Sequence, residues 1–303
     1  MIYLNSKTIL DIIDIKLMKT IILYSDKGYE GMVDSFLISM KYAKCENIPV
    51  LYYTIGFDSN LDYPNLTKIR WEIDPNKIDL TYYKPEILLD TLKYSNEVCY
   101  MDSDIVLGKR FNIDSLFNTE LDYPVCCRGP LEFVWVWYTR GGENFRIDEW
   151  NLMNYYGVKE RSSTYLWASM MTFTEKCRDF LEEWSSILNN PYLLKNARHY
   201  FPFREETAFN VTFWKRGCNQ ILDLIFFNTI KFESFLKVET EDDFNQEIRN
   251  YTEYATVDFG IYETCNNSSI VQFYHGMKPG EDLNKVIDWM KSEINKRELN
   301  QAF

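Results

Sequence analysis

The sequence predicts an α/β domain with a mostly parallel central sheet flanked by helices. Short apolar runs rich in β-forming residues alternate with segments of helical spacing through the first third of the chain, and this alternation is typical of parallel sheets. The fourth apolar run ends on Asp102-Ser103-Asp104, which places polar residues where such sheets bind ligands. No internal repeat or low-complexity linker divides the chain, so its 303 residues suit one elaborated domain.

Each element of the first part is predicted from a local pattern. Residues 20–25 form a short apolar run typical of a buried strand, and Met32, Phe36 and Met40 show helical spacing after it. Pro85 suits the first turn of a helix. We therefore expect strands at residues 20–25, 48–55, 66–73 and 98–101, with helices at 31–43 and 84–94.

The second part of the chain is less regular. Residues 128–154 are rich in Trp, Tyr, Gly and charged residues and are expected to include long loops. Gly217 is a suitable stop for the helix before it. The remaining expected elements are strands at 123–127, 165–173, 222–227 and 270–274 and helices at 175–188, 204–215 and 281–297.

The composition excludes several classes of function. A formal net charge of -12 and a sequence pI near 4.8 leave no basic footprint for nucleic acid and no polybasic membrane anchor. No run of about 18 apolar residues is present, so no transmembrane helix is expected. The seven cysteines are odd in number, form no CxxC pair and lie mostly among apolar neighbours, which favours reduced thiols and a cytoplasmic location. The oligomeric state cannot be read from the sequence.

The strongest local signal is the acidic pair Asp102 and Asp104. Residues i and i+2 of an extended chain point the same way, so both carboxylates can reach one cation. Hard divalent ions such as Mg²⁺ bind carboxylate and phosphate oxygens together. An acidic turn after a strand is the alternative interpretation, and the pattern alone leaves both open.

A histidine in the last part of the chain adds to this signal. The chain has two histidines, and His275 follows the apolar run at residues 270–274, with Gly276 and Lys278 close behind it. An imidazole nitrogen would complete a mixed oxygen and nitrogen site of the kind that Mn²⁺ accepts, and Lys278 could offset phosphate charge. A lone histidine is more often structural, but together with the acidic pair the ligand interpretation is favoured.

Four segments occur along the chain in an order that is typical of one family of enzymes. They are Ser25-Asp26-Lys27-Gly28-Tyr29 after the first strand, Lys84-Pro85 before a helix, Asp102-Ser103-Asp104, and His275-Gly276-Met277-Lys278-Pro279. In this order the chain resembles the GT-A glycosyltransferases, and within them the retaining family 8 that includes glycogenin and bacterial galactosyltransferases. The resemblance covers most of the chain.

The resemblance implies a GT-A-type fold and a metal-dependent transfer of a hexose, with retention, from a UDP-sugar to a sugar or protein acceptor. It implies an extension at residues 1–18 and one catalytic domain at 19–303, with a donor half at 19–128 and an acceptor half at 129–303. Mn²⁺ or Mg²⁺ would be the cation. The implied ligands of the metal are Asp102, Asp104 and His275, and the implied donor-binding residues are Ser25, Asp26, Tyr29, Lys84, Asp102, Ser103, Gly276 and Lys278.

The chain departs from the family pattern at three places. Residues 167–169 read Trp-Ala-Ser where the family often has an Asn and a Gly, and Gly280 stands where the family has a Trp. Glu205 and Glu206 replace an Asp-Gln pair, so Glu206 stands where family members have a Gln beside the reacting sugar carbon. We expect Glu205 or Glu206 to face that carbon, either stabilising positive charge or acting as a nucleophile.

Other interpretations of the same residues remain open. Tyr29 could pack on the following helix, Lys84 could be a solvated charge at a helix start, and Glu205 or Glu206 could only favour a helix dipole. The aromatic run at residues 133–138 could be an ordinary strand or could stack on an acceptor.

Other classes of protein also remain open. Asp102-Ser103-Asp104-Ile105-Val106 fits the first motif of a haloacid-dehalogenase-type phosphatase. A nucleotidyltransferase and a non-catalytic sugar-binding domain are the further alternatives.

Overall fold

The computed structural model describes residues 17–77, 80–117, 119–128, 153–159, 166–190, 204–218, 227–229, 265–266, 270–272 and 281–301. Its main sheet has six strands in the order β3-β2-β1-β4-β7-β6. The strands are β1 (Leu17–Ser25), β2 (Val50–Ile55), β3 (Leu66–Trp71), β4 (Ser95–Met101), β6 (Val125–Arg128) and β7 (Leu166–Thr174). Neighbouring strands from β3 to β4 are parallel, whereas β7 runs antiparallel to both β4 and β6. The predicted α/β class with a mostly parallel sheet is confirmed.

Alternate residues of the central strands pack on opposite faces of the sheet. Ile21 and Leu23 of β1 join one apolar cluster, and Ile22 between them joins the other. Both faces are covered, which explains why these strands read as continuous apolar runs rather than as alternating ones.

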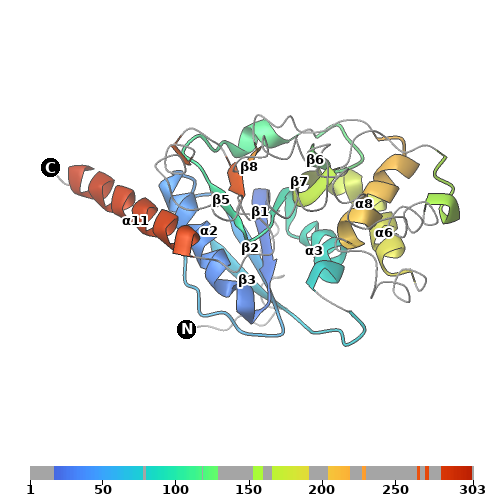
Figure 1. Cartoon of the computed structure of the whole chain (residues 1–303), viewed down its shortest axis with the longest axis horizontal. Helices are drawn as coiled ribbons and strands as arrows, with labels where there is room; N and C mark the ends of the chain where they lie inside the picture. The colour runs from blue at the N-terminus through green and yellow to red at the C-terminus, as the bar shows by residue number, and fades with distance from the viewer. Residues whose placement is uncertain are drawn as a thin grey trace, which may run out of the picture.

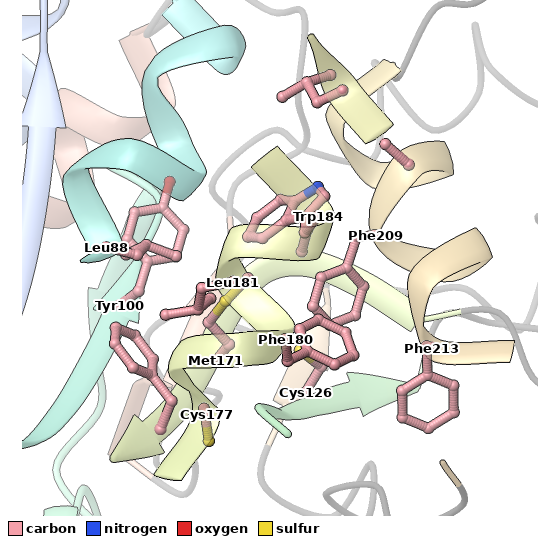
Figure 2. Packing of buried hydrophobic residues seen from close by; sticks show 14 of the residues in the cluster. Leu88, Tyr100, Cys126, Met171, Cys177, Phe180, Leu181, Trp184, Phe209 and Phe213 are labelled. Atoms are coloured by element: carbon pink, nitrogen blue, oxygen red, sulfur yellow. The ribbon is translucent and has the colours of Figure 1, made fainter. Parts of the chain in front are cut away.

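One face of the sheet packs against the helices α3 (Lys84–Thr91), α6 (Arg178–Leu188) and α8 (Arg204–Lys215). Figure 2 shows the aromatic centre of this layer, where Trp184 and Phe180 of α6 lie against Phe209 of α8. Trp184 is completely buried, and its indole nitrogen donates to the Glu205 carbonyl oxygen at 2.8 Å. The first turn of α8 is therefore tied to the packed core.

The opposite face is covered by α2 (Glu30–Tyr42), and α11 (Glu281–Gln301) packs on α2 (Figure 1). A second sheet has the order β5-β9-β8, from β5 (Ile105–Leu107), β9 (Ile270–Gln272) and β8 (Phe227–Thr229). A single turn, which contains the acidic pair, joins β4 to β5, so this sheet is attached directly to the carboxyl end of β4.

Within the described residues, the predicted elements agree with the structure apart from their ends and two features. The helix expected at residues 84–94 ends at Thr91, and the helix expected at 204–215 has those bounds. The strand β5 and the antiparallel direction of β7 were not predicted. The expected loops at 129–152, the run 222–226 and the segment 273–280 lie outside the described residues. Among the residues that are described, no helix has both the length and the apolar character needed to cross a membrane.

A buried amide joins α8 to the start of β7. The Leu166 amide donates to Asn210 Oδ1 at 2.8 Å, and Asn210 Nδ2 donates to the Leu166 carbonyl at 2.9 Å. Among the described residues, the hydroxyl of Thr212, equally buried on the same helix, bonds only to the Ala208 carbonyl within the helix. We expect Asn210→Ala to lower the free energy of unfolding by about 2–4 kcal/mol, because two buried backbone groups lose their partner. Thr212→Val should cost less than about 1 kcal/mol. Urea unfolding of both variants measures the difference, and equal losses would contradict the bridging role.

Candidate active site

The acidic pair lies in a tight turn at the carboxyl end of β4. The Asp102 amide donates to the Ser169 carbonyl of β7 at 2.7 Å, and the Ile105 amide donates to the Asp102 carbonyl at 3.2 Å. The Asp102 side chain is 23% exposed, while Asp104 is buried. The two carboxylates are therefore supplied by a turn rather than by the extended strand on which the sequence argument relied.

A buried lysine lies against this turn. Lys84, the first residue of α3, is 2% exposed, so the interpretation as a solvated helix-start charge is wrong. Its Nζ lies 3.3 Å from Asp102 Oδ1 and 3.7 Å from Glu205 Oε1, and it donates to the Ala168 carbonyl at 3.1 Å. Burial disfavours the ammonium ion, but nearby negative charge, above all that of Asp102, outweighs this cost and raises the pKa of Lys84.

Two buried carboxyl groups come from the first turn of α8. Glu205 faces Lys84, and Glu206 is 6% exposed, so neither is a solvated charge serving only the helix dipole. The Glu206 Oε1 atom is buried and has no hydrogen-bond partner among the described residues. Burial, followed by repulsion from Glu205, raises the pKa of Glu206 well above its usual range, against the opposing effect of Lys84.

Two tyrosines lie beneath the acidic turn, and the sequence analysis missed both as site residues. Tyr100 of β4 donates its hydroxyl hydrogen to Asp102 Oδ1. Its ring stacks on Tyr24 of β1, with the ring centroids 5.7 Å apart and the planes 23° from parallel. The available signal was the period of two along β4, which directs Tyr100 to the face on which the chain continues to Asp102, whose amide is still bonded to β7.

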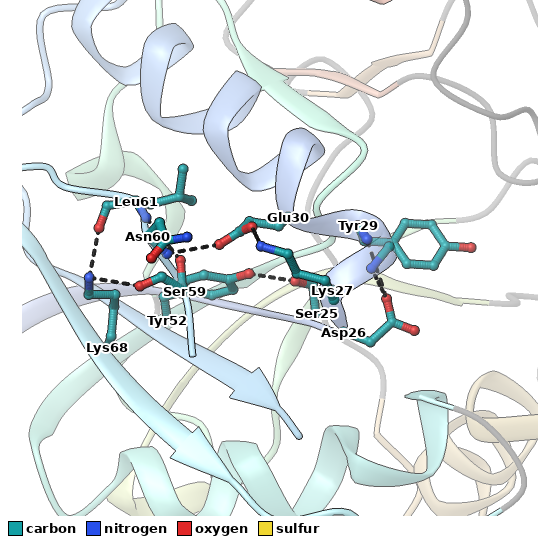
Figure 3. Close-up of polar contacts among 11 residues, drawn as sticks. Ser25, Asp26, Lys27, Tyr29, Glu30, Tyr52, Ser59, Asn60, Leu61 and Lys68 are labelled. Carbon is teal, nitrogen blue, oxygen red and sulfur yellow. Dashed lines mark hydrogen bonds and ion pairs between the residues drawn. The ribbon is translucent and has the colours of Figure 1, made fainter. Parts of the chain in front are cut away.

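The segment after β1 lies beside the end of β4, because Ile22 of β1 pairs with Tyr100. Ser25 is buried and lies 2.6 Å from the Tyr52 hydroxyl, and Asp26 Oδ1 accepts hydrogen bonds from the amides of Gly28 and Tyr29 (Figure 3). Tyr29 is 46% exposed, and its ring points away from the rest of this group in Figure 3. The packing interpretation of Tyr29 is therefore not supported.

The remaining predicted site residues, His275, Gly276 and Lys278, lie outside the described residues, as does the aromatic run at 133–138. Within the part of the chain that the structure describes, no three His, Cys, Asp or Glu side chains form a group able to hold a metal ion. The donor set of Asp102 and Asp104 still fits Mg²⁺ or Mn²⁺, because such ions are commonly held by one or two carboxylates together with substrate phosphates.

Comparison with known proteins gives a match at the level of structure. No family model and no curated protein sequence matches the chain. The galactosyltransferase LgtC, solved with donor and acceptor sugar analogs, superposes with a TM-score of 0.55 at 14% identity over 89% of this chain and 95% of that one. The chain has a glycosyltransferase fold.

Two further glycosyltransferases share this fold. The bifunctional WbbM matches with a TM-score of 0.52 at 12% identity, and GlyE of Streptococcus pneumoniae TIGR4 with 0.51 at 11%. The matches cover 94% and 95% of this chain, but only 52% and 64% of those two proteins. The predicted GT-A-type fold is confirmed, while at this level of identity the likeness is one of fold.

The buried position of Lys84 predicts a large loss of stability on its removal. Lys84→Met should lower the free energy of unfolding by about 3–5 kcal/mol, because Asp102 and Glu205 then lose their buried counter-charge. Lys93, whose side chain is 64% exposed beside Asp90, serves as the control, and Lys93→Met should cost less than about 1 kcal/mol. Guanidinium unfolding of both variants measures this. A loss for Lys84→Met no larger than that of the control would contradict a buried ion pair.

The environment of Glu206 predicts a pH-dependent stability in EDTA. The pKa of Glu206 is raised in the folded state, so the unfolded chain loses this proton first as the pH rises above the ordinary value of 4.5. The free energy of unfolding therefore falls with rising pH until the pKa of the folded state is passed. Glu206→Gln removes this loss, so the variant should gain stability relative to the natural chain by at most about 1.4 kcal/mol per pH unit in that window. Glu120→Gln, at a carboxylate that is 86% exposed, should show no such trend. Stability curves for Glu206→Gln and the natural chain that run parallel in pH would refute the assignment.

Proposed function

We propose that the chain is a metal-dependent glycosyltransferase that moves a hexose, with retention, from a UDP-sugar to a sugar or protein acceptor. The main support is the cluster of Asp102, Lys84, Glu205 and Glu206 at the carboxyl edge of a sheet whose fold is shared with glycosyltransferases. Ligands bind at this edge in open α/β sheets.

The donor diphosphate is proposed to bind at the turn of Asp102, Ser103 and Asp104. The two carboxylates would hold Mn²⁺ or Mg²⁺, with His275 as a further ligand, and a bound cation supplies a Lewis acid that stabilises the departing diphosphate. Lys84 is fixed by Asp102 and the Ala168 carbonyl, so its charge is already oriented before a phosphate arrives. Gly276 and Lys278 are proposed to complete the phosphate contacts.

The nucleoside is proposed to lie at the end of β1. There Asp26 is held by two backbone amides, Tyr29 presents an exposed ring, and Ser25 is fixed by Tyr52. An exposed ring is suited to stacking on a base, and a carboxylate oxygen is suited to accepting hydrogen bonds from ribose or base.

The carboxyl groups of Glu205 and Glu206 are proposed to face the reacting carbon. Positive charge develops on the sugar ring as the bond to the diphosphate breaks. A buried carboxylate stabilises that positive charge, and no water has to reorganise for it to do so. A nucleophilic carboxylate would form a covalent glycosyl intermediate from the same position. Glu205 faces the Lys84 ammonium and is the carboxylate suited to either role, because a water-excluded carboxylate interacts strongly with a neighbouring charge. Burial raises the pKa of Glu206, so Glu206 takes such a role only after it loses its proton.

A cytoplasmic location is proposed from the cysteines. Within the described part of the chain, Cys45, Cys177 and Cys265 are buried free thiols. Burial raises the pKa of Cys177 to about 11, so this thiol stays protonated and unreactive at neutral pH. Such thiols suit a reducing compartment.

Calorimetric titration with UDP tests the proposal directly. UDP should bind in the presence of Mn²⁺ and bind at least about 10-fold more weakly in EDTA, because the cation bridges carboxylates and phosphates. Asp104→Ala should abolish this dependence on Mn²⁺, whereas Asp288→Ala, at an aspartate of α11 whose side chain is 78% exposed, should not.

If Mn²⁺ does not strengthen the binding of UDP or of any other nucleoside diphosphate, the proposed donor site is refuted. Phosphatase activity through Asp102 would then be assayed next. If the proposal holds, hydrolysis of a panel of UDP-sugars identifies the sugar.

A further inference from the structure

Two tyrosines beneath the acidic turn have no part in the proposed transfer. Tyr24 and Tyr100 lie on the neighbouring strands β1 and β4, and Tyr24 is two residues beyond Ile22, the register partner of Tyr100. They therefore lie on the same face of the sheet as α3 and α8, where Tyr100 is 1% exposed. Their rings stack, and their hydroxyls lie close enough to interact.

The hydroxyl of Tyr100 is committed to the acidic turn. A phenol has one hydrogen to donate, and Tyr100 donates it to Asp102 Oδ1. Tyr24 contacts Tyr100 through its stacked ring and lies with its hydroxyl beside that of Tyr100, so it restrains the position of the Tyr100 hydroxyl.

Both described donors to the Asp102 carboxylate act on the same oxygen. Tyr100 donates to Oδ1, and Lys84 Nζ lies 3.3 Å from Oδ1. Lys84 also lies 5.0 Å from the centre of the Tyr100 ring, so these two groups fix each other. Among the described residues, the contacts of this carboxylate leave Oδ2 without a donor.

The Tyr100 hydroxyl is held in place by its ring, which is 1% exposed and stacked on Tyr24. A water molecule in the same place could rotate and exchange, whereas a stacked ring buried in the core holds its hydroxyl in one position.

We propose that Tyr100, supported by Tyr24, is a positioning residue of the cation site, which holds Asp102 by Oδ1 so that Oδ2 is presented to the metal ion. This inference rests on the proposed function, because it assumes that Asp102 is a metal ligand. Groups that orient ligands in this way commonly change metal affinity by about 10–100-fold when removed.

The test compares three variants that each remove one buried hydroxyl: Tyr100→Phe, Tyr24→Phe and Tyr53→Phe. Tyr53 is the matched control, because it is fully buried and donates to a carboxylate, Asp90 Oδ2, at 2.9 Å outside the site. Mn²⁺ is titrated into each metal-free protein at saturating UDP, and thermal unfolding is recorded in EDTA.

The expected result separates the tyrosines of the site from the control. Tyr100→Phe should weaken Mn²⁺ binding by about 10-fold or more, Tyr24→Phe by a smaller factor, and Tyr53→Phe not measurably. A merely structural role would instead lower the unfolding temperature in EDTA and leave Mn²⁺ affinity unchanged.

The outcomes also distinguish this inference from the proposed function. If the natural chain binds Mn²⁺ with UDP and Tyr100→Phe binds it equally well, the inference is wrong and the proposed function stands. If the natural chain shows no UDP-linked Mn²⁺ binding, both fail. Should Tyr100→Phe not fold, Tyr24→Phe decides, and an affinity equal to that of Tyr53→Phe overturns the inference.

Discussion

The candidate site depends on one buried ammonium group. Lys84 contacts Asp102 after β4, the Ala168 carbonyl of β7 and Glu205 of α8, and it belongs to α3. Four elements that are distant in sequence thus meet at one positive charge. Because a buried charge is costly unless it is paired, each contact is required by the others.

Among the residues that the structure describes, acidic groups outnumber basic groups in this cluster. Lys84 faces the carboxyl groups of Asp102 and Glu205, with Glu206 buried beside them and Asp104 buried in the turn. An excess of acidic groups in a buried site either retains protons or attracts cations. Glu206, whose pKa is raised, retains a proton. At the acidic turn, a divalent cation would be attracted instead.

The sequence was sufficient for the fold because both of its periodic signals were strong. Apolar runs located the parallel strands, and helical spacing located α2 and α8 with correct or nearly correct ends. The direction of β7 could not be predicted, since a strand buried on both faces reads the same in either orientation. The short strand β5 has three residues and pairs with distant β9, so no local pattern reveals it.

The site residues were predicted from two sources. Asp102 and Asp104 were found from a motif at a strand end, whereas Lys84, Glu205 and Glu206 were found from the family resemblance. The structure brings Lys84 together with Asp102 and Glu205. Tyr24 and Tyr100 were missed because a tyrosine in an apolar run looks like ordinary core. Their role depends on the register between β1 and β4, which is a property of the paired strands and not of either segment.

Strand β7 contributes to the site through its backbone. The Ala168 carbonyl accepts from Lys84, and the Ser169 carbonyl accepts from the Asp102 amide. A peptide carbonyl is the same whatever side chain follows it, so these two contacts place little selection on residue identity. Residues 167–169 therefore supply both contacts as Trp-Ala-Ser, without the Asn and Gly of the pattern that the chain otherwise resembles, because the geometry of the strand and not the identity of its side chains is required.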